Sequence, residues 1–161
     1  MNFKKVNRTT LGFGPHLMLD LWECNKKKLT DLTHAYFLLD SLPSKIGMTK
    51  IAPPQVLSYP GKEGSFDKGG ISGYVLIAES HITLHTFEEQ GHAFVDIFSC
   101  KKFDIDNAVN ILVNAFEAKR YKKIVSDRGE EFPKEISLAT EIVKQERKST
   151  QNGEKGNQRH R

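Results

Sequence analysis

A chain of 161 residues is long enough to bury a core in one domain without metal or disulfide support. Its hydrophobic share of 38% and charged share of 27% exclude a wholly disordered chain and a membrane-embedded one. The formal net charge of +4 is contributed by residues 144–161, so the remaining residues are neutral overall, which argues against a nucleic-acid-binding protein.

The first half of the chain predicts a strand followed by a helix. Residues 15–22 alternate as a half-buried strand does, with leucines at every second position. Residues 26–39 have apolar residues at helical spacing, and Asn25 is placed to cap the start of that helix. A short strand is expected at 47–51, followed by a long irregular segment rich in proline and glycine from Pro53 to Gly70.

The second half predicts three consecutive strands, a helix and a last strand. A continuous apolar run covers 73–79, and alternating patterns cover 82–87 and 93–100. Asp104 is placed to cap a helix that runs through Tyr121, and residues 122–127 follow as a strand. This order predicts an α+β fold, a two-layer α/β sandwich with a mostly antiparallel sheet and helices on one face.

The domain boundary and the cellular location follow from composition. Residues 1–143 are predicted to form the folded domain, and residues 144–161 a basic, disordered tail. No stretch approaches the roughly 20 apolar residues of a membrane-spanning helix, and the N-terminal region has no signal-like apolar segment. With two cysteines, Cys24 and Cys100, both expected to be reduced, the chain is predicted to be cytoplasmic.

Residues 79–87 concentrate an acid, hydroxyls and two imidazoles where two predicted strands meet. Taken one by one, these residues fit an ordinary polar strand face. Zinc binding is disfavoured, because His81 and His85 lie roughly 13 Å apart on an extended strand, and no metal site is predicted. A serine hydrolase is disfavoured because Ser80 lacks the Gly-x-Ser-x-Gly turn that exposes such a nucleophile.

A longer pattern resembles the short prokaryotic S-adenosylmethionine decarboxylase proenzymes, which are pyruvoyl-dependent. The resemblance spans residues 12–128 and rests on Ser72-Gly73, on Ala78-Glu79-Ser80-His81-Ile82-Thr83-Leu84-His85-Thr86, and on Asp96-Ile97-Phe98-Ser99-Cys100. The Glu-Ser-His-x-x-x-His-Thr core with its downstream cysteine is highly specific.

This resemblance implies that the chain cleaves itself between Glu79 and Ser80. The Ser80 hydroxyl would take over the acyl group of Glu79 as an ester, and elimination followed by hydrolysis would leave an N-terminal pyruvoyl group, the self-generated cofactor. His85 would transfer protons in this processing, a role suited to an imidazole with a pKa near neutrality. Ser72 would assist, although a serine that merely belongs to a Ser-Gly turn is nearly as good an interpretation.

The resemblance also implies how the processed enzyme works. The pyruvoyl carbonyl would form a Schiff base with the substrate amine and draw off the electrons released with carbon dioxide. Cys100 would return a proton to the substrate, Phe87 would stack on the adenine, and Glu89 would bind the ribose. A homodimer that shares its sites between subunits, and a role in polyamine and spermidine biosynthesis, are further expectations.

Two alternatives remain open from the sequence. Phe87 stands where a larger aromatic residue is usual in the family, Glu88 replaces a common proline, and the segment from Pro53 to Gly70 looks expanded. These departures leave room for the same pyruvoyl chemistry on ornithine or arginine. The second alternative is a processing-incompetent regulatory homologue, against which the intact set of Glu79, Ser80, His85 and Cys100 argues.

Overall fold

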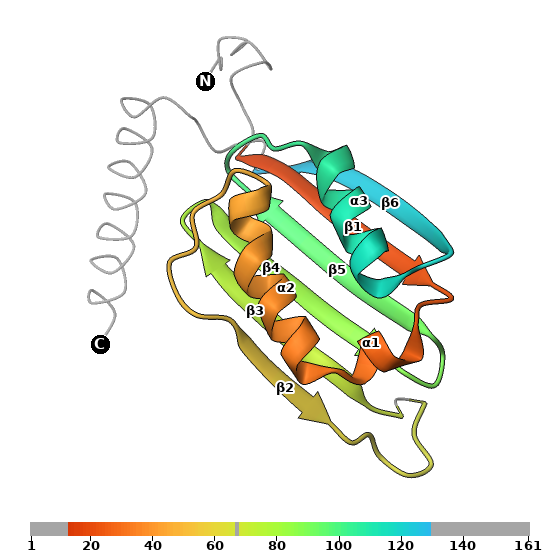
Figure 1. Cartoon of the computed structure of the whole chain (residues 1–161). Coiled ribbons are helices and arrows are strands. Elements are labelled where there is room, and N and C mark those ends of the chain that lie inside the picture. The colour runs from red at the N-terminus through yellow and green to blue at the C-terminus, as the bar shows by residue number, and fades with distance from the viewer. Residues whose placement is uncertain (1–12, 67, 130–161) are drawn as a thin grey trace, which may run out of the picture. The chain divides into compact units, whose positions relative to one another are not determined.

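The computed structural model describes residues 13–66 and 68–129, and these residues form one antiparallel sheet with helices on one face (Figure 1). The strand order is β2-β3-β4-β5-β1-β6. The pairs β2–β3, β3–β4, β4–β5 and β5–β1 are all antiparallel. The predicted α+β two-layer sandwich is therefore confirmed.

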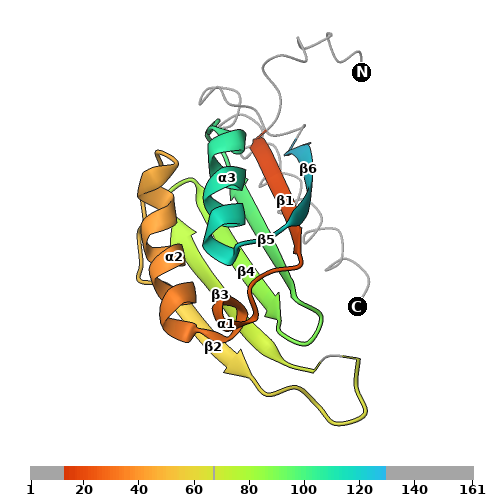
Figure 2. The same cartoon turned by 45° about the vertical axis from the view of Figure 1, so that its right-hand side comes forward.

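Six strands and three helices make up the described chain. The strands are β1 (Gly14–Trp22), β2 (Gln55–Tyr59), β3 (Gly70–Ile77), β4 (Ser80–Phe87), β5 (His92–Ser99) and β6 (Arg120–Arg128). The helices are α1 (Lys26–Thr30), α2 (Leu32–Lys45) and α3 (Ile105–Phe116). All three helices lie on the same side of the sheet, which Figure 2 shows after a turn of the molecule.

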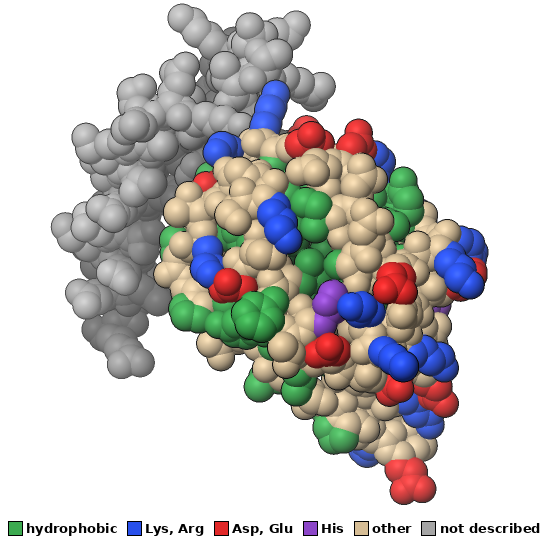
Figure 3. Space-filling model, viewed as in Figure 1, with side chains coloured by type: hydrophobic (Ala, Val, Ile, Leu, Met, Phe, Trp, Pro, Cys, Tyr) green, Lys and Arg blue, Asp and Glu red, His purple; other side chains and the backbone are tan. Residues whose placement is uncertain are grey.

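The core lies between the helices and the sheet. Alternate residues of the central strands are buried there and pack against apolar residues of α2 and α3. The largest fully buried side chains are Phe116, Leu17, Leu19, Leu21, Leu29, Leu39, Leu42, Ile71, Ile77, Ile82, Leu84 and Ile97. The helical face, in contrast, shows Lys, Arg, Asp and Glu side chains spread over its surface (Figure 3), as suits a face in contact with water.

The helix predicted over 26–39 is two helices. Asn25 caps α1 as expected, because its side chain accepts a hydrogen bond from the backbone N–H of Lys27. Asp31 has an extended backbone and caps α2 by accepting from the N–H of His34 at 2.9 Å. The second helix then continues past the predicted end to Lys45, with Pro43 in its last turn.

Two further predictions of local structure were wrong. Residues 47–51 form only an isolated bridge between Lys50 and Ile77, whereas β2 lies within the segment expected to be irregular. The third helix ends at Phe116 rather than Tyr121, because Glu117 adopts a left-handed conformation (φ 51°) that stops it.

The chain divides into two compact units, Gly14–Ser126 and a second unit made of residues 1–13 and 127–161. The first contains the sheet and the helices. In the second unit, the described backbone N–H of Phe13 donates a hydrogen bond to the carbonyl of Arg128 at 2.7 Å. The predicted tail at 144–161, and its boundary at residue 143, lie outside the described residues.

Candidate functional site

The Glu79–Ser80 peptide bond lies in the tight turn between β3 and β4. Ile77 pairs with Ser80, so Ala78 and Glu79 form the two-residue connection. The turn is held from the side by Thr49: its carbonyl accepts from the N–H of Ala78 at 2.8 Å, and its N–H donates to the Glu79 carboxylate at 3.1 Å. The scissile bond predicted from the sequence is therefore in a fixed position.

The carbonyl of Glu79 accepts a hydrogen bond from the backbone N–H of Cys100 at 2.9 Å. This contact exists because Ser80 pairs with Ser99, the last residue of β5, and the chain turns at Cys100 directly beyond it. A backbone N–H aimed at a carbonyl oxygen stabilises the negative charge that develops when the carbon is attacked. The neighbourhood of Cys100 thus provides one half of an oxyanion hole at the scissile bond.

Ser80 has an unusual backbone conformation with φ +152°. This region is essentially reserved for glycine, and a residue with a side chain pays about 1–3 kcal/mol to occupy it. The strain falls on the residue that the sequence predicts to attack its own preceding peptide bond. The Ser80 hydroxyl lies 3.1 Å from Nδ1 of His81, and both residues are half-buried.

Ser72 and His85 form a second pair on β3 and β4. The two residues are direct partners in the strand register, and the Ser72 hydroxyl lies 3.0 Å from Nδ1 of His85. The structure therefore brings together two of the four predicted processing residues. The Ser72 side chain takes part in a specific contact on a strand rather than in a Ser-Gly turn.

The structure does not bring the Ser72–His85 pair to Ser80. Ser80 and His85 stand five residues apart on β4, and at about 3.3 Å per residue their backbones are roughly 16 Å apart. The residues predicted to work together thus fall into two clusters along one strand. The first contains Glu79, Ser80, His81 and Cys100; the second contains Ser72 and His85.

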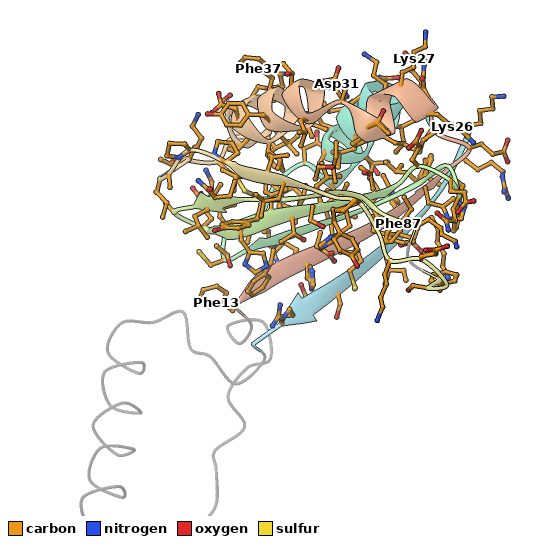
Figure 4. All side chains as sticks on the ribbon, turned by 90° about the horizontal axis from the view of Figure 1, so that it is seen from below. Phe13, Lys26, Lys27, Asp31, Phe37 and Phe87 are labelled. Carbon is orange, nitrogen blue, oxygen red and sulfur yellow. The ribbon has the colours of Figure 1, made fainter. Side chains whose placement is uncertain are left out.

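The predicted substrate residues lie with the second cluster. Phe87 ends β4, with its ring 5.4 Å from that of Phe94, and Glu89 follows in the turn to β5. An open hollow of about 430 Å³ at this turn is lined by Lys26, Lys68, Glu88 and Glu89. Figure 4 shows Phe87 and Lys26 toward the same end of the sheet.

The two cysteines have different surroundings. Cys100 is half-buried beside the scissile bond. Cys24 is buried, and burial raises the pKa of its thiol to about 11, although a hydrogen bond with the Ala93 backbone lowers it in part. Such a thiol is a poor nucleophile and acid, as suits a cysteine that packs in the core. Within residues 13–66 and 68–129, no group of three His, Cys, Asp or Glu side chains is arranged to hold a metal ion.

A sequence model of S-adenosylmethionine decarboxylase matches residues 15–129, which include both clusters. The chain belongs to the S-adenosylmethionine decarboxylase family. The match extends over the three helices and nearly all of the sheet, so membership does not rest on the motif around Ser80 alone.

Relatives of this decarboxylase family resemble the chain over most of their length. An S-adenosylmethionine decarboxylase proenzyme of Thermodesulfovibrio yellowstonii is 35% identical over 132 residues, 78% of this chain and 92% of the relative. One from Oceanobacillus iheyensis is 35% identical over 106 residues, 65% of this chain and 78% of the relative. The crystal structure of the adenosylmethionine decarboxylase from Aquifex aeolicus is similar with a TM-score of 0.59 and 30% identity, covering 74% of this chain and 92% of that one.

Three contacts at the candidate site were not predicted from the sequence. These are the Cys100 N–H on the Glu79 carbonyl, the Thr49 N–H on the Glu79 carboxylate, and the His81 imidazole beside the Ser80 hydroxyl. The first two are made by backbone groups, which leave no signature in side-chain identity. The third joins neighbours in sequence, which strand alternation would place on opposite faces.

Proposed function

We propose that this chain is the proenzyme of a pyruvoyl-dependent S-adenosylmethionine decarboxylase that cleaves itself between Glu79 and Ser80. The observation that best supports this proposal is the environment of that bond. Ser80 has a strained backbone, and the carbonyl that its hydroxyl would attack is already hydrogen-bonded to the Cys100 N–H.

Self-cleavage would begin with attack of the Ser80 hydroxyl on the Glu79 carbonyl carbon. The oxygen becomes negatively charged in this step, and the N–H of Cys100 at 2.9 Å stabilises it. The amide becomes an ester, and the strained backbone at Ser80 can relax once the peptide bond is broken. Removal of the Ser80 Cα proton then expels the α-carboxylate of Glu79, and hydrolysis of the resulting N-terminal dehydroalanine releases ammonia and leaves the pyruvoyl group.

The residues around position 80 fit a pyruvoyl group formed there. When formed, this group supplies a carbonyl that binds the substrate amine and accepts the electron pair left by carbon dioxide. Cys100, which is half-buried and has its backbone N–H on the Glu79 carbonyl, would return a proton to the substrate. Phe87 and Glu89 lie with the second cluster at the other end of β4, so in a shared site they would come from the partner subunit, where their π-face and carboxylate suit an adenine and a ribose respectively.

The separation of the two clusters supports a homodimer as the active form. His85 is roughly 16 Å along the strand from Ser80, so it cannot take a proton there within its own chain. A two-fold contact between the helix-free faces of two sheets would bring Ser72 and His85 of the partner subunit toward Ser80. Each dimer would then have two complete sites.

The helix-free face, named here the open face, has the composition of an interface. None of its residues on β1, β3, β4 and β5 is a lysine or arginine, and aromatic rings are frequent. Its members are His16, Met18, Asp20, Trp22, Ser72, Tyr74, Leu76, His81, Thr83, His85, Phe87, His92, Phe94, Asp96 and Phe98. Rings on neighbouring strands contact each other across it, as Phe87 and Phe94 do.

Location and pathway are extensions of the same proposal. The helices among the described residues are all too short or too polar to cross a bilayer. A cytoplasmic location and a role in polyamine synthesis remain predictions.

Two measurements test the proposed function together. Mass spectrometry of the purified native protein should find fragments 1–79 and 80–161, the second with an N-terminal pyruvoyl group, whereas S80A should remain one chain. Release of labelled carbon dioxide from carboxyl-labelled S-adenosylmethionine, but not from ornithine or arginine, should accompany cleavage. The matched control S44A, on α2, should cleave and turn over like the wild type. An uncleaved wild-type chain, or fragments from S80A, would refute the proposal.

A further inference from the structure

His81 lies against the nucleophile of the proposed self-cleavage, yet the mechanism above gives it no role. Its Nδ1 atom is 3.1 Å from the Ser80 hydroxyl oxygen. His85, the imidazole expected to act in processing, is on the far part of the strand, where its own Nδ1 faces Ser72. In each chain, His81 is therefore the imidazole in contact with Ser80.

The contact depends on the strained backbone. In a regular strand, neighbouring side chains point to opposite faces and cannot meet. The φ of +152° at Ser80 departs from a regular strand, and the Ser80 hydroxyl meets the imidazole of the next residue. His81 is also held from the other side, where its ring makes an edge contact with Phe98, its partner on β5, at 5.8 Å between centroids.

We propose that His81 is the general base of the first step of self-cleavage, the transfer of the Glu79 acyl group from nitrogen to oxygen. The inference rests on the proposed function. It assigns a base to the acyl shift, because His85 of the same chain is too distant from Ser80 to act in that step. The two histidines then act in different steps: His81 acts in the acyl shift, and His85 of the partner subunit acts in the elimination that follows.

The proton balance of the step is complete without any further reactant. Nδ1 of His81 takes the proton of the Ser80 hydroxyl as the oxygen attacks the Glu79 carbonyl carbon. The carbon–nitrogen bond then breaks, and the imidazolium returns the same proton to the departing nitrogen of Ser80. The product is an ester with a free amine, an isomer of the starting chain, and His81 is neutral again.

Several ionisable groups lie near this imidazole. Glu79 and Cys100 lie at the same end of β4. Next to Phe98, Asp96 on β5 and His16 on β1 form a pair, with 3.2 Å between Oδ1 of Asp96 and Nε2 of His16. The opposite neighbour, Leu76 on β3, contributes no charge.

The experiment follows the conversion of freshly translated full-length chain into its two fragments. H81N keeps a hydrogen-bonding group near the position of Nδ1 but cannot accept the proton. It should cleave at least roughly a hundredfold more slowly than the wild type, the usual effect of losing a general base. H34Q, which removes a half-buried histidine of α2 on the other side of the sheet, is the matched control and should cleave at the wild-type rate.

Hydroxylamine distinguishes the two steps, because it cuts an ester and leaves an amide intact. In H85A the ester should form and accumulate, so hydroxylamine should release the fragments. In H81N the amide should persist, so hydroxylamine should release almost none. A second readout is chemical rescue: H81G should recover cleavage when imidazole is added to the buffer, because the free base can take the proton that the missing side chain would have accepted.

The outcomes separate this inference from the proposed function. If the wild-type chain does not cleave, the proposed function itself fails. If the wild type cleaves and H81N does so within a few-fold of its rate, the role of His81 is refuted. Efficient release of fragments from H81N by hydroxylamine would refute it as well, since the ester would then have formed without His81.

Discussion

Cys100 contributes two groups to the candidate site. In the proposed reaction, self-cleavage uses its backbone N–H and decarboxylation uses its thiol. Its backbone N–H contacts the Glu79 carbonyl, whereas its thiol is the acid expected to return a proton to the substrate. C100A removes only the thiol. It should therefore cleave at close to the wild-type rate but turn over more slowly by roughly 10²–10⁴-fold.

Fragment analysis and carbon dioxide release, measured on the same C100A sample, check this separation. C24A is the matched control, because it removes a thiol that lies away from the scissile bond in the core, and it should retain both activities. A C100A enzyme with wild-type turnover would remove the thiol from the mechanism.

The pKa of Cys24 makes a prediction about reactivity. Burial raises this pKa to about 11, so at pH 8 only about one thiol in a thousand is ionised. In a C100A background, iodoacetamide should label the remaining cysteine slowly, and the rate should rise about tenfold per pH unit as the thiolate fraction grows. Labelling at pH 8 as fast as in the urea-unfolded chain would show that the thiol is not buried.

At the scale of secondary-structure elements, Thr86 joins the β3–β4 hairpin to α1. Its hydroxyl accepts from the N–H of Ile71 at 2.8 Å and donates to the carbonyl of Leu29 at 2.7 Å, and the residue is 3% exposed. T86V would fill the same space but leave both backbone groups without this partner. A loss of about 1–3 kcal/mol in the free energy of unfolding is expected for each unsatisfied buried group.

Urea unfolding of uncleaved S80A protein tests this effect without the complication of two fragments. T86S retains the hydroxyl and loses only a methyl group, so it should be destabilised much less than T86V. Equal destabilisation by both changes would mean that the methyl group, and not the hydrogen-bonded bridge, matters at this position.

The accuracy of the sequence predictions varied with how each element is buried. β1, β4 and β5 have one face in the core, so their apolar residues alternate and their positions were predicted within two residues. β2 is an edge strand whose residues are mostly exposed, so it has no alternating pattern, and it was missed. The break at Asp31 was missed because the apolar spacing continues across it into α2.

The residues of the candidate site were accessible to sequence reasoning, but their grouping was not. The motif named Ser80 and His85 together, and the strand that contains them separates them by five residues. Nothing in a sequence gives the φ of +152° at Ser80, which places its hydroxyl beside His81. Proximity along the motif therefore did not predict which side chains are in contact.

In the proposed dimer, the two clusters along β4 belong to different sites. One chain alone therefore has no complete site. Ser80 and Cys100 stand at one end and Ser72 and His85 at the other. If two open faces pack against each other by a two-fold axis, each site takes one half from each subunit. Defects in opposite halves should then complement each other in a mixed dimer.

Co-expression of S80A and H85A chains tests this arrangement. In the mixed dimer, one site has both defects, whereas the other combines the intact Ser80 of the H85A chain with the intact His85 of the S80A chain. Only H85A chains should be cut, and with equal expression and random pairing about half of them should be, because half of them sit in mixed dimers. Each variant expressed alone should remain uncleaved.

The same experiment distinguishes the two histidines. His81 is adjacent to Ser80 in its own chain, so H81N paired with S80A leaves neither site complete, and no cleavage should be restored. H85A paired with S80A should restore it. Complementation of H81N by S80A would place His81 in the other half of the site. If H85A is not complemented by S80A, with mixed dimers verified by affinity tags, a site shared across two subunits is contradicted.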